Sequence, residues 1–136
     1  MKKKVALSKP KNRIPSHVRK IHCNGFKRED GLLDIEGELL DIKEYDFPLK
    51  DGKIKTKGSP VHHMKVRITI NEKLEILYAE AITIHGPYEI CPKGADNIYG
   101  LVGLKIGPGW KHRVKVAIGG KKGCTHITEL MGPIAT

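Results

Sequence analysis

The chain has few cysteines and no long apolar run. Its 136 residues include three cysteines, Cys23, Cys91 and Cys124. This odd number at wide spacing argues against a disulfide framework and favours a reducing, cytoplasmic location. No apolar stretch approaches the roughly 20 residues that span a bilayer, so no membrane association is expected. The N-terminal lysines are not followed by an apolar segment, and no secretory signal is therefore predicted.

Several sequence motifs of common enzyme classes are also missing. The chain contains no glycine-rich dinucleotide fingerprint, no P-loop, no serine nucleophile elbow, no zinc-protease HExxH and no CxxC pair. Each of these motifs places defined groups on a turn or a helix to perform a known chemistry. Nucleotide binding, serine hydrolysis and thioredoxin-like redox chemistry are therefore not expected.

Acidic residues are absent from the first 28 positions, which hold ten of the 25 basic residues. The rest of the chain has equal numbers of acidic and basic residues, so the whole net charge of +10 comes from this segment. We expect a basic flexible arm over residues 1–16 and a single domain over residues 17–136. The arm is interpreted as a solubilising tail. The alternative is a salt-sensitive contact of Lys2, Lys3 and Lys4 with an anion such as nucleic acid, although no aromatic residue is interleaved to stack on bases.

The first two thirds of the domain have the pattern of antiparallel strands. An N-terminal ribbon is expected to contain strands over residues 18–23, 33–39 and 40–45, with Gly37 at a bulge. Residues 48–60 have the composition of a surface loop. The clearest hairpin joins residues 64–70 to a long strand over residues 74–84, in which one side is expected to carry Ile76, Tyr78, Ile82 and Ile84.

The last third has helical periodicity interrupted by glycines. About three helices are predicted: from Asp96 to Ile106, from Trp110 to Ile118, and from Cys124 or Thr125 to Pro133. Strands followed by helices indicate an α+β fold, in which the helices pack on an antiparallel sheet.

Cysteine and histidine residues, which are soft and borderline metal ligands, lie at three predicted turns next to strands or helices. Thiolates and imidazoles in one set suit zinc, ferrous iron or an iron–sulfur cluster. The predicted metal site consists of His62, Cys91, Cys124 and His126. Each member also has an ordinary interpretation, because cysteines are often buried as small apolar residues and loop histidines are usually solvated. A second candidate, the carboxylate pair Asp34 and Glu36 on one strand face, suits acid–base chemistry or simply the polar face of a sheet.

Six segments together resemble a known bacterial family. They are Arg28–Gly37, Asp41–Lys43, Pro60–His62, Gly86–Tyr88 with Cys91, Leu101–Leu104 and Gly123–Leu130. The family that these segments resemble is catalogued as domain of unknown function 2889. The resemblance covers nearly everything after residue 18 and implies no activity. That family usually has an aspartate after the histidine aligned with His62, whereas this chain has His63.

Residues 58–134 more loosely resemble the iron–sulfur cluster assembly scaffold proteins. The shared order is a ligand loop, a hairpin, a second ligand loop and helices with a final ligand pair. In this chain His62 replaces a cysteine, Cys91 lies four positions beyond the expected one, and Cys124 and His126 have altered spacing. The resemblance implies a Cys2His2-like set, nearer to a closed zinc site than to a labile cluster site, and a protein partner in metal or cluster handling.

The function expected from the sequence is a small cytoplasmic protein that holds or delivers zinc or an iron–sulfur centre. Two alternatives stay open. In the first, Cys124 is a nucleophile activated at a helix start, with His126 or His62 as its base. In the second, the protein is a non-catalytic binding module recruited through its basic arm.

Overall fold

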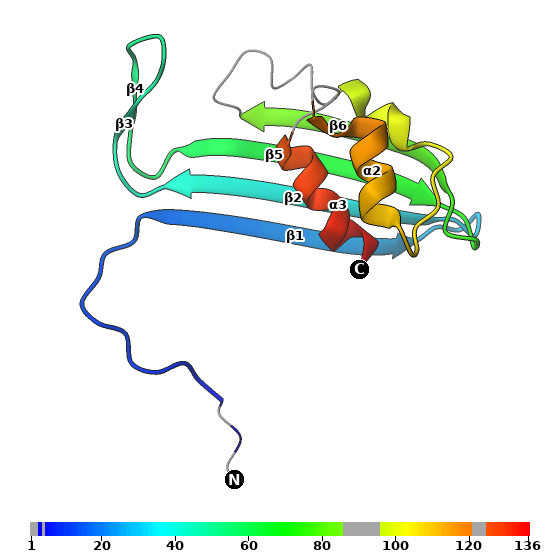
Figure 1. The fold of residues 1–136 in the computed structure, drawn as a ribbon, viewed down its shortest axis with the longest axis horizontal. Helices are drawn as coiled ribbons and strands as arrows, with labels where there is room; N and C mark the ends of the chain where they lie inside the picture. Colours follow the sequence, from blue (N-terminus) through cyan, green and yellow to red (C-terminus); the bar gives the residue numbers. More distant parts are fainter. Residues whose placement is uncertain (1–2, 4, 86–95, 121–124) are drawn as a thin grey trace.

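A computed structural model describes residues 3, 5–85, 96–120 and 125–136. Its main element is a four-stranded antiparallel sheet in the order β1-β2-β5-β6, and a two-stranded hairpin of β3 and β4 projects beyond one end (Figure 1). The strands are β1 (His17–Lys27), β2 (Leu33–Lys43), β3 (Phe47–Pro48), β4 (Ile54–Lys55), β5 (Pro60–Ile70) and β6 (Ile76–His85). A short 3-10 helix, η1 (Asp96–Leu101), precedes two α-helices, α2 (Trp110–Ile118) and α3 (Thr125–Ala135).

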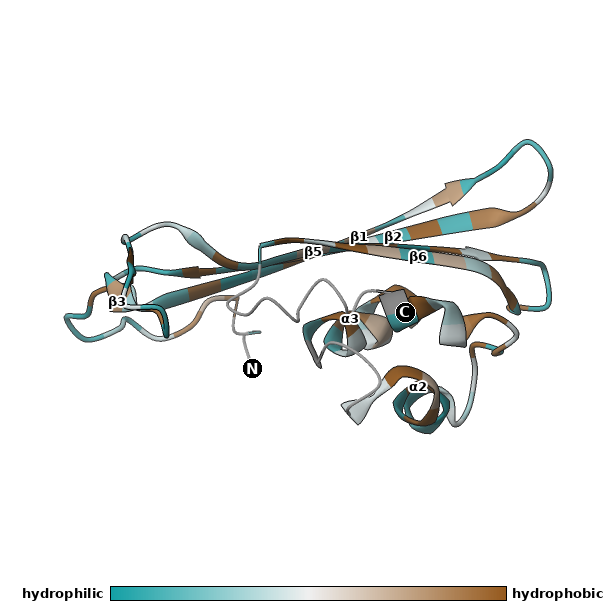
Figure 2. Ribbon diagram, turned by 90° about the horizontal axis from the view of Figure 1, so that it is seen from above, coloured by the Kyte–Doolittle hydropathy of each residue, from teal (hydrophilic) through white to brown (hydrophobic). Residues whose placement is uncertain are grey.

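Both α-helices lie on one face of the sheet (Figure 2), and the core fills the space between these layers. Strand β5 alternates as its sequence predicts: Met64, Val66 and Ile68 are buried, while Lys65 and Arg67 are exposed. Helix α3 buries residues with helical spacing against the sheet, namely Ile127, Leu130, Met131 and Ile134. The two helices are joined by the buried indole N–H of Trp110, which donates to the carbonyl of Met131 at 3.0 Å. The α+β class is therefore confirmed.

The prediction of a bulge at Gly37 and of two strands in this region is wrong. Residues Leu33–Lys43 form one continuous strand, and Gly37 pairs regularly with Cys23 on one side and Val66 on the other. A side chain here would collide with α3, because a Cβ atom at Gly37 would lie 2.8 Å from Cδ1 of Ile134. The glycine thus lets the helix approach the sheet closely.

The prediction of a full helix from Asp96 to Ile106 is also wrong, so two α-helices are present among the described residues and not about three. Helical structure ends at Leu101, and Gly103 adopts a positive φ of 93° that a helix does not permit. The next backbone groups bind strand β6: the N–H of Ile76 donates to the carbonyl of Leu104, and the N–H of Gly103 donates to the carbonyl of Ile76. Sheet-like hydrogen bonds therefore replace the helical ones.

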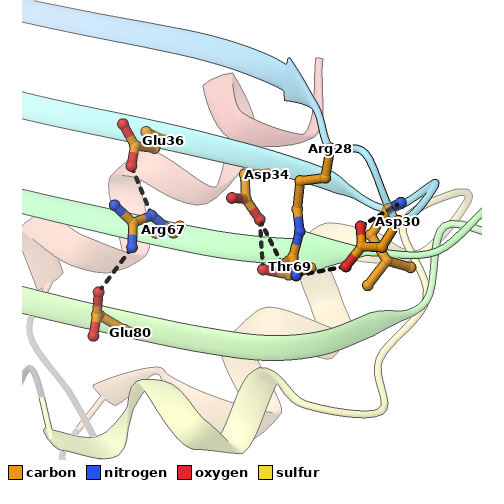
Figure 3. Close-up of polar contacts among 8 residues, drawn as sticks. Arg28, Asp30, Asp34, Glu36, Arg67, Thr69 and Glu80 are labelled. Carbon is orange, nitrogen blue, oxygen red and sulfur yellow. Dashed lines mark hydrogen bonds and ion pairs between the residues drawn. The ribbon is translucent and has the colours of Figure 1, made fainter.

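The opposite face of the sheet is charged (Figure 3). Arg67 contacts Glu36 at 2.7 Å and Glu80 at 3.4 Å across three strands. The hydroxyl of Thr69 donates to Asp34 at 2.7 Å. Asp34 and Glu36 each have a cross-strand partner, as expected for the polar face of a sheet.

Strand β6 does not present its apolar residues on one side as the sequence predicts. Ile76 is buried, but Tyr78, Ile82 and Ile84 are exposed, so they do not share its environment. A register irregularity between Thr69 and Ile70 in the β5–β6 pair offsets the alternation after Ile76.

The N-terminal arm lies apart from the sheet (Figure 1). Residues 5–16 form no helix or strand, and all of them are exposed. Lys3 is exposed as well, while Lys2 and Lys4 lie outside the described residues. The division at residue 16 and the anion contact of the arm stay predictions. None of the helices among the described residues has the length and apolar character that a membrane crossing requires.

Candidate functional site

A buried carboxylate stands at the end of the apolar face of β2. Alternate residues of this strand point toward the helices, and after Gly37 and Leu39 the next such position is Asp41. Its side chain is only 1% exposed. Burying a carboxylate costs free energy unless the charge is paired and hydrogen-bonded, so the partners of Asp41 define this region.

Arg19 is the first of these partners and lies directly opposite Asp41 on β1. Its Nε donates to Oδ1 at 2.7 Å and its Nη2 donates to Oδ2 at 2.8 Å, a two-pronged contact. Its remaining Nη1 donates to Glu129 of α3 at 2.6 Å, which ties the helix to the sheet. Burial acts to raise the pKa of Asp41, but the hydrogen bonds and charge of Arg19 outweigh it and hold this pKa at about 2. Asp41 is therefore ionised at neutral pH.

His62 lies on the other side of Asp41, in register with it on β5. Its Nδ1 is 2.9 Å from Oδ2 of Asp41, and because an ionised carboxylate only accepts, Nδ1 is the donor. The hairpin strand predicted over residues 64–70 leaves His62 in the loop before it, and this prediction is wrong. Strand β5 already begins at Pro60, where proline is tolerated because the first residue of a strand need not donate to the ladder.

His126 approaches from the first turn of α3. Its ring stacks on the ring of His62 with 3.6 Å between centroids and 26° between planes. Its Nε2 lies 3.9 Å from Oδ2 of Asp41. The pKa of His62 is lowered by burial and by the charge of His126, against the opposing effect of Asp41. Two imidazolium ions at this spacing would repel each other, so the arrangement favours at least one neutral ring with a free lone pair.

Three donor groups thus converge from three elements of the fold. One ligand atom from each of Asp41, His62 and His126 lies within 4.8 Å of the others. Ligands that share a zinc ion at about 2.0–2.2 Å are roughly 3–3.5 Å apart, so small side-chain rotations would bring these atoms to coordination distance. Two imidazole nitrogens and one carboxylate oxygen suit zinc or ferrous iron better than calcium or magnesium.

The structure brings together two of the four predicted ligands, His62 and His126. Cys91 and Cys124 lie outside the described residues, so their participation stays a prediction. His63 points to the opposite face of the sheet, where its Nε2 is 3.5 Å from Glu38. His17 lies at the edge of the cluster, with Nε2 at 3.6 Å from Oδ1 of Asp41.

Sequence reasoning missed three members of the cluster, namely Asp41, Arg19 and Glu129. One signal was present in the alternation of β2: Asp41 occupies a position that should be apolar, and a charge on an apolar face demands a partner. The identity of that partner depended on the strand register, which places Arg19 opposite Asp41 although they are 22 positions apart.

The chain matches a protein-family model over a range that includes all residues of this cluster. The family model described as "Protein of unknown function (DUF2889)" matches residues 17–136, a range that contains every strand and helix described above. Neither a curated protein nor a solved structure matches the chain. The resemblance to domain of unknown function 2889 is confirmed, while the resemblance to iron–sulfur scaffold proteins stays a prediction.

Proposed function

We propose that this protein, which belongs to the DUF2889 family of proteins of unknown function, binds a divalent transition-metal ion through His62, His126 and Asp41. The observation that carries the proposal is the convergence of two imidazoles and one carboxylate within 4.8 Å. Three protein ligands leave at least one coordination position open, as in zinc sites that bind water or a substrate.

The surroundings of the three ligands fit a metal centre in two respects. The pKa of His62 is lowered, so its ring is largely neutral at pH 7 and offers a lone pair. Arg19 holds the carboxylate of Asp41 through both oxygens, and such outer contacts orient the ligands of a metal. The positive charge of Arg19 also repels a dication, which lowers the affinity and suits an exchangeable metal more than a permanent one.

Metal binding at Nδ1 of His62 requires the neutral ring to carry its proton on Nε2, whereas in the metal-free protein Nδ1 donates that proton to Asp41. Binding is therefore expected to release little or no proton at pH 7, where the ring is already neutral, and to weaken below neutral pH, where the rings become protonated. The proposal also includes two predictions from the sequence. The first is a role in holding or delivering the metal, and the second is that Cys91 and Cys124 are further ligands. Cys124 lies two positions before His126 in the chain, so it is the natural candidate for a fourth ligand.

The experiment is metal analysis followed by titration. Protein purified without air is analysed for zinc and iron, stripped with a chelator and titrated with Zn²⁺ by calorimetry. We expect one equivalent to bind, and His62→Gln and His126→Gln each to weaken binding by at least about tenfold. The matched control is His63→Gln, because His63 is the next residue of β5 but lies on the opposite face.

The proposal fails if folded, stripped protein takes up neither zinc nor iron. It also fails if His63→Gln weakens binding as much as His62→Gln, because the metal would then be bound elsewhere. Loss of affinity in Cys124→Ser, with the histidine variants also impaired, would extend the ligand set to the predicted thiolate.

One observation favours a second function, acid–base catalysis without a metal. The hydrogen bond from Nδ1 of His62 to Asp41 leaves Nε2 unprotonated, as in a catalytic histidine oriented by a carboxylate. A screen of small ester and amide substrates in the presence of a chelator separates the two functions. Turnover that persists with the chelator and disappears in His62→Gln would favour catalysis, whereas absence of turnover leaves the metal proposal as the better account.

A further inference from the structure

A pocket of about 430 Å³ lies beside the histidine pair, between the ends of β1 and β2 and the β3 strand. It is lined by the imidazoles of His62 and His126, by the side chains of Lys43 and Lys50, and by apolar residues that include Phe47 and Val61. Small-molecule sites commonly have volumes of roughly 300–1,000 Å³ and combine an apolar wall with a few polar groups. The pocket has this composition, and its size suits a ligand with a single ring.

The ionisable residues among the described lining of the pocket are all basic. No carboxylate is found among the described residues that line it, whereas two lysines and three histidines are. The nearest buried acid, Asp41, is paired with Arg19, whose charge is shared with the more exposed Glu129. Asp46, in the segment leading to β3, accepts a hydrogen bond from the backbone N–H of Lys57 at 2.7 Å and is not part of the lining. Because the ring of His62 is largely neutral at pH 7, the positive charge that attracts an anion into the pocket is that of Lys43.

Lys43 is held in place by aromatic rings. Its Nζ lies 4.5 Å from the ring centroid of Phe47 and 5.7 Å from that of Tyr45. Such cation–π contacts restrict a flexible side chain without neutralising its charge. The ammonium group consequently remains available to a negatively charged group that enters the pocket, while the ring of Phe47 offers apolar surface.

We infer that this pocket binds a small organic anion, a carboxylate attached to an apolar body. The ammonium group of Lys43 interacts with the carboxylate, and the apolar wall covers the body of the ligand. An inorganic anion satisfies the charge but leaves the apolar wall in contact with water, so it binds more weakly. This inference goes beyond the metal proposal, since Lys43 attracts an anion whether or not a metal is present.

The test uses the full chain stripped of metal and kept with a chelator, so that it is independent of the metal proposal. Benzoate, benzyl alcohol and inorganic phosphate are titrated separately while amide chemical shifts are recorded by NMR. We expect benzoate to bind at least about tenfold more tightly than either of the other probes, with shifts at Lys43, Val61 and His62. Lys43→Met should weaken benzoate binding by at least about threefold, and Lys43→Arg should retain it.

Lys53→Met is the matched control, because Lys53 belongs to the β3–β4 hairpin but does not line the pocket. The inference is overturned if benzyl alcohol or phosphate binds as tightly as benzoate, if Lys53→Met has the same effect as Lys43→Met, or if the shifts lie outside the pocket. A dispersed NMR spectrum of each variant shows that it is folded. Zinc binding that persists without benzoate binding would reject this inference alone.

Discussion

Replacing Asp41 by asparagine tests the electrostatic centre of the cluster. The substitution removes the negative charge but keeps a side chain of nearly the same size, so the packing around this buried position is preserved. The pKa of Asp41 is held at about 2 against an ordinary value of 3.8, and this difference corresponds to a little over 2 kcal/mol of folding free energy. Arg19 is 38% exposed, and solvent screening reduces the figure. We expect Asp41→Asn to lose about 1.5–2 kcal/mol at pH 7.

The pH dependence of this loss is specific to the mechanism. A carboxylate with a depressed pKa stabilises the fold fully above its unfolded value of 3.8, and the stabilisation is lost as the pH falls through 2. Near pH 3 roughly half of the difference between wild type and Asp41→Asn should remain. Urea unfolding at pH 7, 4 and 3, followed by circular dichroism, measures the difference.

The control for this prediction is Glu129→Gln, which alters the other contact of Arg19. Glu129 is 41% exposed, so its removal should cost less than about 1 kcal/mol. Equal stability of Asp41→Asn and wild type at pH 7 would refute the reasoning, as would a difference that does not change between pH 7 and pH 3.

Three further outcomes are expected. Gly37→Val should destabilise the fold by about 1–3 kcal/mol through overpacking against Ile134. The double variant with Ile134→Ala should lose less free energy of unfolding than the sum of the two single variants. Additive losses in urea unfolding would contradict this contact. Trp110→Phe should cost about 1–2 kcal/mol in the same assay, because the buried carbonyl of Met131 loses its donor, and an unchanged stability would show that the hydrogen bond is unimportant. Because the pKa of His62 is lowered in the folded chain, the unfolded chain takes up a proton near pH 6.5 before the folded one does as the pH falls. The free energy of unfolding should therefore decline between pH 7 and pH 5. A decline of the same size in His62→Gln would exclude His62 as its origin.

Local periodicity accounts for the parts of the fold that the sequence predicted well. Strand β5 alternates apolar and polar residues, and α2 and α3 repeat apolar residues with helical spacing, so burial on one face determines each element. The segment after Leu101 could not be predicted in this way. Its apolar residues fit a helix equally well, and only its hydrogen bonds to β6 decide the backbone conformation.

The candidate site was predicted in part for a similar reason. His62 and His126 were identified by residue type and by their positions near turns. Their true neighbours depend on strand register and on where α3 begins, and neither is encoded in local spacing. Asp41 and Arg19 meet across two adjacent strands, so a description of the sequence one segment at a time leaves both as ordinary charged residues.

The most direct test of the metal centre is anomalous diffraction from crystals grown with Zn²⁺. Data collected above and below the zinc absorption edge locate the ion without assumptions about the chemistry of its ligands. We expect a peak within about 2.0–2.2 Å of a nitrogen of His62, a nitrogen of His126 and an oxygen of Asp41. A zinc ion bound elsewhere, or no peak between the two rings, would contradict the proposal.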